Sequence, residues 1–143
     1  MNILIAKIIV KLIEPKLKVG VEDSFSYDTE EERVLLGTVP EDDCGFLRHM
    51  REYHEHGELA DEFSLTLWSI LHEIGHYHTI DYAEEDLETR ALCAVIPKEV
   101  AEKNPSIQDL YFNMDDEFLA TDWAVEFAYN HFRLCKIFDR LVG

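Results

Sequence analysis

The feature of this sequence that most constrains its fold is a pair of histidines four residues apart in an apolar segment. His72 and His76 flank Glu73 and Gly75 in the sequence His-Glu-Ile-Gly-His. Residues four apart in an α-helix lie about 40° apart around its axis and one turn along it, so both imidazoles can meet at one metal ion. Neutral imidazole nitrogen is a ligand that suits zinc. The motif therefore predicts a helix that carries a zinc site.

The residues around the motif support a helix. Asp61 or Ser64 can cap its start, and the helix is expected to run to about His78. Its apolar positions recur close to a helical period: Phe63, Leu67, Trp68, Ile70, Leu71 and Ile74.

Glu73 is the predicted general base of a hydrolytic reaction. It follows the first histidine directly, so its carboxylate can reach a water held at the metal. Zinc lowers the pKa of such a water towards about 7, and a carboxylate can then accept its proton. Gly75 is expected to let another segment approach the metal side of the helix closely.

The site needs a third ligand, because a catalytic zinc usually has three protein ligands and one open position. Tyr82 stands six residues after His76, where a third histidine would extend the motif, and His78 points away from the two-histidine face. A carboxylate from a later helix is therefore expected. Two stretches offer one: Glu84, Glu85 and Glu88 in the nearer, and Glu117, Asp122 and Glu126 in the later.

Glu117 is the preferred third ligand because small residues, Ala120 and Ala124, lie on the same helical side. They would let this helix pack closely on the helix that carries the histidines. Asp122 could then orient a ligand histidine through its free N–H. Five residues are chemically able to stabilise an oxyanion beside the metal: Tyr77, Tyr82, Tyr111, Tyr129 and His131.

This pattern resembles the gluzincin metallopeptidases, and among them the minimal ImmA/IrrE-type peptidases of bacteria and phages. The resemblance covers the two motif helices and, loosely, the strands before them. It implies a small zincin-like fold that binds Zn²⁺ through His72, His76 and Glu117, with Glu73 as the general base. Such helices often carry an aspartate four residues after the ligand glutamate, where this chain has Thr121.

Two functions are open to such a chain. The first is a zinc-dependent peptidase; its small size leaves little room for a specificity domain, so the expected substrate is a peptide or a loop or tail of another protein. By analogy with the ImmA type, this would be a phage or host regulatory enzyme. The alternative is a non-catalytic interaction module whose zinc stabilises the fold or an interface. A closed fourth position on the zinc favours the module, and an open one favours the peptidase.

The sequence predicts a single domain over residues 1–143, of the α+β class, mostly helical with a short antiparallel sheet before the motif helix. An amphipathic helix is expected at residues 1–13 and ends before Pro15. Two strands are expected at residues 19–27 and 33–39. The second, which ends at Pro40, could offer an exposed edge to an extended substrate.

Further helices are expected on both sides of the motif. Residues 44–56 form a short one, in which His49, His54 and His56 are interpreted as a solvated face. Residues 81–96 form another, begun by a capping box at Asp81. One long helix begins at Asp115 or Asp116 and includes the apolar residues up to Phe138.

The charge limits the classes of partner. A net charge of −17, from 13 basic and 30 acidic side chains, disfavours nucleic acids and anionic membranes. No apolar run reaches the length of a membrane span, and residues 1–13 are expected to pack on the domain, with an interfacial anchor as the alternative. The three cysteines form no CxxC pair and are expected to be reduced thiols in a cytoplasmic protein: Cys44, Cys93 and Cys135.

Overall fold

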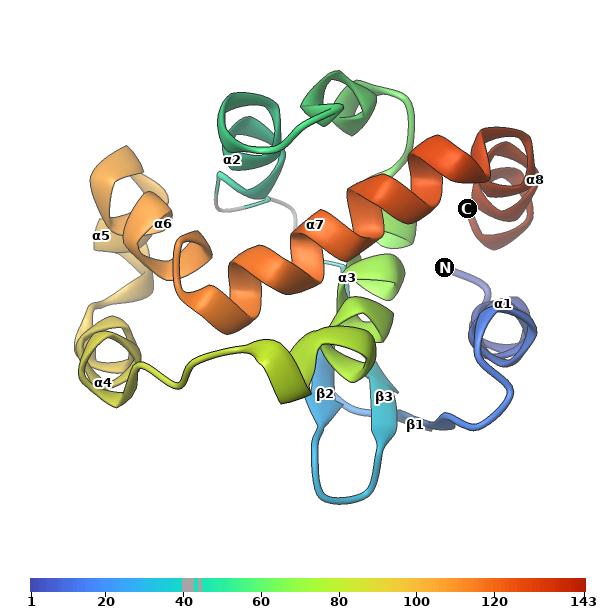
Figure 1. Cartoon of the computed structure of the whole chain (residues 1–143), viewed down its shortest axis with the longest axis horizontal. Coiled ribbons are helices and arrows are strands. Elements are labelled where there is room, and N and C mark those ends of the chain that lie inside the picture. Colours follow the sequence, from blue (N-terminus) through green and yellow to red (C-terminus); the bar gives the residue numbers. More distant parts are fainter. Residues whose placement is uncertain (40–42, 44) are drawn as a thin grey trace.

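Helices dominate the structure, a computed structural model that describes residues 1–39, 43 and 45–143 (Figure 1). Three short strands form one small sheet near the motif helix, so the predicted mostly helical α+β class is confirmed. Pro40 and Cys44, where a strand was expected to end and a helix to begin, lie outside the described residues. The elements are α1 (Ile3–Ile13), β1 (Lys18–Val21), β2 (Ser26–Asp28), β3 (Arg33–Leu36), α2 (Phe46–Tyr53), η1 (Gly57–Asp61), α3 (Leu65–Thr79), η2 (Ile80–Tyr82), α4 (Leu87–Val95), α5 (Lys98–Glu102), α6 (Pro105–Phe112), α7 (Asp115–Asn130) and α8 (Phe132–Val142).

The sheet differs from the predicted antiparallel pair. Its order is β1-β3-β2, with β1 parallel and β2 antiparallel to β3, so the sheet is mixed. The single strand expected at residues 19–27 is two strands, β1 and β2. The chain between them crosses past the end of β3, so that β1 and β2 pair with opposite sides of β3. A Cβ on Gly37 would lie 2.1 Å from the backbone of Ser24, so this crossing needs a glycine. The expected edge strand, β3, is therefore the central one, and β2 is at the edge.

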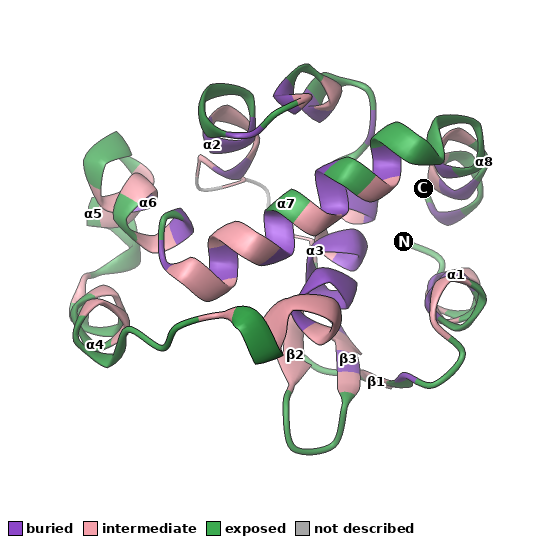
Figure 2. Cartoon of the chain, viewed as in Figure 1, coloured by how far each residue is buried: buried purple, intermediate pink, exposed green. Residues whose placement is uncertain are grey.

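The motif helix α3 lies at the centre of the fold, and Figure 2 shows it buried along much of its length. Ser64 caps it as predicted, since its hydroxyl accepts a hydrogen bond from the Leu67 N–H at 3.2 Å. The buried apolar residues of α3 form the middle of the hydrophobic core: Leu67, Trp68, Ile70, Leu71 and Ile74. Burying this face stabilises the helix that carries the metal ligands.

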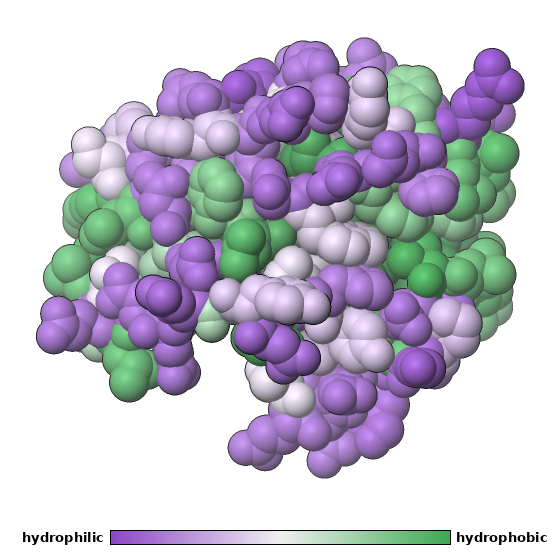
Figure 3. All heavy atoms as spheres, viewed as in Figure 1, coloured by the Kyte–Doolittle hydropathy of each residue, from purple (hydrophilic) through white to green (hydrophobic). Residues whose placement is uncertain are grey.

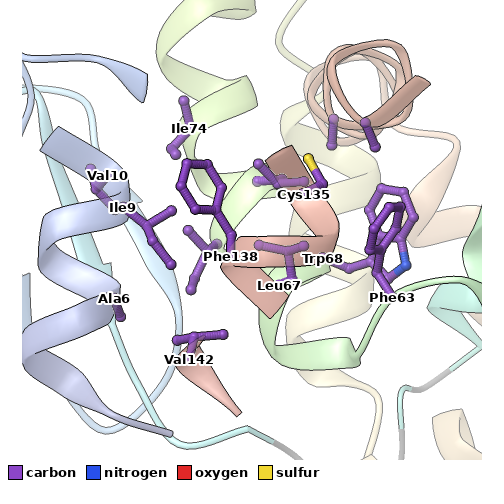
Figure 4. Packing of buried hydrophobic residues seen from close by; sticks show 14 of the residues in the cluster. Ala6, Ile9, Val10, Phe63, Leu67, Trp68, Ile74, Cys135, Phe138 and Val142 are labelled. Atoms are coloured by element: carbon purple, nitrogen blue, oxygen red, sulfur yellow. The ribbon is translucent and has the colours of Figure 1, made fainter. Parts of the chain in front are cut away.

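Helices α1 and α8 pack against each other on one side of α3. Ala6 and Ile9 of α1 and Phe138 and Val142 of α8 belong to the same buried cluster, which Figure 4 shows beside α3. The Asn2 N–H donates a hydrogen bond to the Val142 carbonyl at 3.0 Å and joins the two helices directly. The predicted N-terminal helix is thus confirmed. Across the described residues, no helix is long and apolar enough to cross a membrane.

Two helix boundaries differ from the predictions. Helix α4 begins at Leu87 instead of near Asp81, because the Asp86 carboxylate accepts the Thr89 N–H at 3.0 Å and caps the helix there. The expected long last helix is interrupted at His131, whose backbone leaves the helical region at φ −128° and ψ 41°. This break turns the apolar side of α8 back towards α3 and α1.

The interpretation of the histidines before α3 as a solvated face is wrong for two of them. His49 and His54 are only 1% and 6% exposed. The ring of His54 stacks on Phe118 of α7 at 4.2 Å, and His49 Nε2 lies 2.8 Å from Asn113 Oδ1. These side chains are therefore part of the contact between α2 and the later helices, which the sequence pattern of α2 alone does not reveal.

The two cysteines among the described residues, Cys93 and Cys135, are free thiols. Cys135 is buried in the core, and this burial raises the pKa of its thiol to about 12. Its sulfur is therefore a packing group, as expected from its apolar helical surroundings.

The contact between α3 and α7 depends on Gly75. A Cβ on this glycine would lie 2.3 Å from the Ala120 carbonyl oxygen of α7. Ala120 and Ala124 are both fully buried at the crossing. The predicted close approach of the two helices is thus confirmed, and it requires small residues on both sides.

Replacing Gly75 with alanine should separate α3 from α7. The added methyl group meets backbone, which cannot rotate away, so the Gly75→Ala variant should lose about 1–3 kcal/mol of unfolding free energy, measured by urea denaturation. Gly143→Ala is the matched control, because its Cβ approaches Asp139 at 3.2 Å only at the end of the chain. Equal stability of the two variants would contradict a tight crossing.

Candidate metal centre

His72, Glu73 and His76 form a buried group on α3. Each offers an atom suited to metal binding, and these atoms all lie within 4.8 Å of one another. The helical spacing of four residues accounts for the pair of histidines, as the sequence predicted. Both imidazoles are buried, so little water competes with a metal ion for their nitrogen atoms.

Glu117 of α7 completes the group from across the helix crossing. Its Oε2 lies 2.8 Å from His72 Nε2 and 3.2 Å from His76 Nε2. Atoms that share a tetrahedral zinc at bonds of about 2.0–2.1 Å lie roughly 3.4 Å apart. Both separations are shorter than this spacing, as direct hydrogen bonds are, so a small outward shift of the carboxylate would let the two imidazoles and Glu117 hold one zinc ion as three ligands.

The two histidines favour the ionised form of Glu117, which is the form that binds a metal ion. Burial by itself raises the pKa of the Glu117 carboxyl, but hydrogen bonds with His72 and His76 outweigh it and hold that pKa well below its ordinary value. Burial likewise lowers the pKa of His76, yet the hydrogen bond and charge of Glu117 raise it overall. Glu117 is thus an anion at neutral pH, the state in which a carboxylate binds a cation.

Thr121 orients the ring of His72. Its hydroxyl oxygen lies 3.0 Å from His72 Nδ1 and is itself buried, one helical turn after Glu117. When Nδ1 donates to this hydroxyl, the lone pair of Nε2 faces the metal position. The prediction that Asp122 has this role is wrong, because the Asp122 carboxylate accepts from His54 Nδ1 at 3.0 Å. The spacing of four from Glu117 is the sequence signal that could have identified Thr121.

Glu73 lies at the boundary between two hollows. The larger, of about 710 Å³, is polar and is lined by β2, by Glu73 and His76, and by later helices. The smaller, of about 280 Å³, is mostly apolar and includes Phe46, Phe112 and His72. Both include Glu73 and Tyr111, so a bound chain could pass from one to the other across Glu73. Burial raises the pKa of Glu73, against the opposite influence of the two histidines.

The other predicted ligands lie outside this group. Glu84 and Glu85 line the larger hollow but are exposed, and Glu88 is exposed in the first turn of α4. Asp122 and Glu126 line a separate hollow beside His56. The structure therefore brings Glu117, and none of these five acids, into contact with both histidines.

Three candidates for the oxyanion contact lie elsewhere. The ring of His131 lies tilted against that of Phe127, with centroids 4.5 Å apart, and is exposed at the start of α8. Tyr82 and Tyr129 are 79% and 52% exposed. His78, expected to point away from the motif face, stacks on Trp123 at 4.7 Å.

Tyr111 is the candidate that reaches the centre. Its hydroxyl donates a hydrogen bond to Glu117 Oε1 at 3.0 Å, and burial, with the charge of Glu117, raises its pKa well above the ordinary value. Sequence reasoning missed two neighbours. Arg90 Nη2 lies 3.7 Å from the same Glu117 oxygen, and the ring of Tyr27 stacks on His76 at 6.3 Å. Neither has a local sequence signal, because α4 and β2 reach the site only through tertiary packing.

Comparison with known proteins yields no relative. No protein-family model, curated protein or solved structure matches this chain significantly. The chemistry of the site therefore has to be inferred from its own residues.

Removing the Glu117 carboxylate should abolish tight zinc binding. Loss of a residue that merely orients a ligand costs about 10–100-fold in metal affinity, so Glu117→Ala should weaken zinc binding by more than about 100-fold. Elemental analysis and competition with a chelator would measure this. Glu88→Ala and Glu126→Ala are matched controls that should each retain about one zinc per chain. Loss of zinc from either control instead would contradict Glu117 as the third ligand.

Zinc affinity should fall as the pH falls. Burial lowers the pKa of His76, but Glu117 outweighs burial and leaves that pKa above its ordinary value of 6.5, and a protonated imidazole cannot bind zinc. Below that pKa, affinity should drop about tenfold per pH unit for each proton displaced, and above it the curve should flatten. Calorimetric titration in two buffers of different protonation enthalpy would count the protons released. An affinity that is constant between about pH 6 and pH 8 would contradict a histidine site.

Proposed function

We propose that this chain is a zinc-dependent peptidase, with His72, His76 and Glu117 as metal ligands and Glu73 as the general base. The observation that carries the proposal is the position of Glu117 Oε2, which lies 2.8 and 3.2 Å from the two histidine Nε2 atoms. The resemblance to the gluzincin and ImmA/IrrE-type peptidases implies the same four residues. Three protein ligands beside an open cleft are typical of catalytic zinc, whereas structural zinc is usually enclosed by four.

Zinc bound at these ligands would supply Lewis acidity, which makes water more acidic and polarises a peptide carbonyl. Glu73, next to His72 and facing both hollows, accepts the proton of the attacking water and returns it to the leaving amine. Tyr111 is protonated at neutral pH, and its O–H, which donates to Glu117 Oε1 in this structure, would turn from that oxygen to donate a hydrogen bond to a developing oxyanion. Thr121 holds His72 in the required orientation.

The edge strand β2 supports a peptide as the substrate. Ser26 and Tyr27 of β2 line the larger hollow, and β3 occupies only one side of this strand. An extended peptide could add to the other side through main-chain hydrogen bonds. Its side chains on one side of the scissile bond would enter the apolar hollow formed by Phe46 and Phe112.

The Glu73→Gln variant tests the proposed reaction. It preserves the shape of the side chain but removes the base, so the variant should bind zinc like the unmodified chain and lose about 100-fold or more of its hydrolytic rate. The probe is a mixture of peptides from a digested proteome, incubated with the zinc-loaded chain and read by mass spectrometry. Glu126→Gln, on the other side of α7, is the control and should keep full activity.

The same variant separates the second candidate, a non-catalytic zinc module. The observation that favours this module is the closeness of Glu73 to both histidines, which would let its carboxylate occupy a fourth ligand position. In that case Glu73→Gln would weaken zinc binding and lower the melting temperature, and the unmodified chain would cleave none of the peptides.

A further inference from the structure

Helices α1 and α8 both expose a stripe of large aliphatic side chains. In α1 the stripe recurs every four residues, and in α8 at spacings of three and four, so each stripe lies along one side of its helix. The exposed fractions range from 41% for Leu134 to 67% for Leu4. We call these residues the α1–α8 face: Leu4, Ile8, Leu12, Leu134, Ile137 and Leu141.

The two stripes lie on neighbouring helices. Helices α1 and α8 share the buried cluster of Ile9, Phe138 and Val142, and their ends are joined by the Asn2–Val142 hydrogen bond. In the space-filling view, hydrophobic residues gather over these two helices at the right of the molecule; others lie at the left, over α4 to α6 (Figure 3). An apolar area that spans two helices is typical of a binding surface.

The charge of these two helices is opposite to that of the whole chain. The chain carries 30 acidic and 13 basic side chains, yet α1 has no acidic residue and α8 has only Asp139. Asp139 is turned to Ser64, where its carboxylate accepts the backbone N–H at 3.1 Å. The basic residues of the two helices number five: Lys7, Lys11, Arg133, Lys136 and Arg140.

Four of these cations are available for an external anion. Lys136 binds Glu62 at 3.1 Å. Within the described part of the chain, the other four have no carboxylate within ion-pair distance. Helical geometry places Lys7 and Lys11 beside the stripe of α1, and Arg133 and Arg140 beside that of α8. The face therefore combines apolar side chains with uncompensated positive charge along its margin.

We propose that the α1–α8 face binds the surface of an anionic membrane. Aliphatic side chains on an amphipathic helix enter the boundary between headgroups and acyl chains, while adjacent lysines and arginines contact anionic headgroups. A second copy of this chain fits less well, because a two-fold contact through the same face would bring the cations of both copies together. The proposal does not depend on the metal centre.

The net charge of −17 does not oppose this binding as strongly as the sequence suggests. At physiological salt, charges are screened beyond about 8 Å, so a membrane touching α1 and α8 responds mainly to the residues of that face. The acidic side chains elsewhere would repel other orientations, which would leave the α1–α8 face as the one that approaches.

Co-sedimentation of the whole chain with lipid vesicles tests the proposal. We expect binding to vesicles of equal parts phosphatidylglycerol and phosphatidylcholine, little binding to pure phosphatidylcholine, and release at high salt. The double variant Leu4→Glu with Leu141→Glu should bind about tenfold more weakly or worse, because two inserted side chains become anionic. Both positions are exposed, so the variant should keep the circular dichroism spectrum and melting temperature of the unmodified chain.

The matched control is Leu87→Glu with Leu92→Glu, which changes two exposed leucines of α4, at 65% and 50%, by the same charge. This control should bind vesicles like the unmodified chain. Three results would overturn the proposal: no binding to the anionic vesicles at low salt, equal loss in both double variants, or unchanged binding of the Leu4/Leu141 variant. A dimer in analytical ultracentrifugation that the Leu4/Leu141 variant dissociates would also overturn it and assign the face to a contact between copies.

Discussion

The close crossing of α3 and α7 is the contact on which the candidate site depends. Gly75 has no side chain at the point where the Ala120 carbonyl approaches, so the two backbones come nearer than most residues would permit. That approach places Glu117, one turn before Ala120, against His72 and His76. If α3 and α7 lay even slightly farther apart, the Glu117 carboxylate could not share one metal ion with both imidazoles, because metal–ligand distances vary by only a few tenths of an ångström.

Burial at this crossing has an electrostatic cost that the site itself offsets. A buried carboxylate is unfavourable unless it is paired, and here two imidazoles, Tyr111 and more distantly Arg90 surround Glu117. The same groups hold Glu117 ionised and hold the imidazoles at one position. The fold thus brings together side chains that could hold a metal ion, and Thr121 adds the orientation of one ring.

Local sequence patterns predicted the individual helices of this protein better than the contacts between distant segments. The apolar period of α3, its cap at Ser64 and the spacing of the small residues along α7 are each patterns within one helix, and each was found from the sequence. The errors arose where distant segments meet. The split of residues 19–27 into β1 and β2 depends on a crossing beside Gly37, and the burial of His49 and His54 depends on α7. Neither contact has a periodic signal in the chain.

The sequence by itself determined that two histidines and a glutamate share one helix face, because helical geometry fixes positions within a turn. It also limited the third ligand to a few acids on later helices. Tertiary packing alone decided which acid reaches the histidines, that Thr121 and not Asp122 orients His72, and that α1 and α8 combine their exposed aliphatic and basic residues. Those contacts join residues far apart in the chain, and their geometry is set by how side chains fill the core between helices.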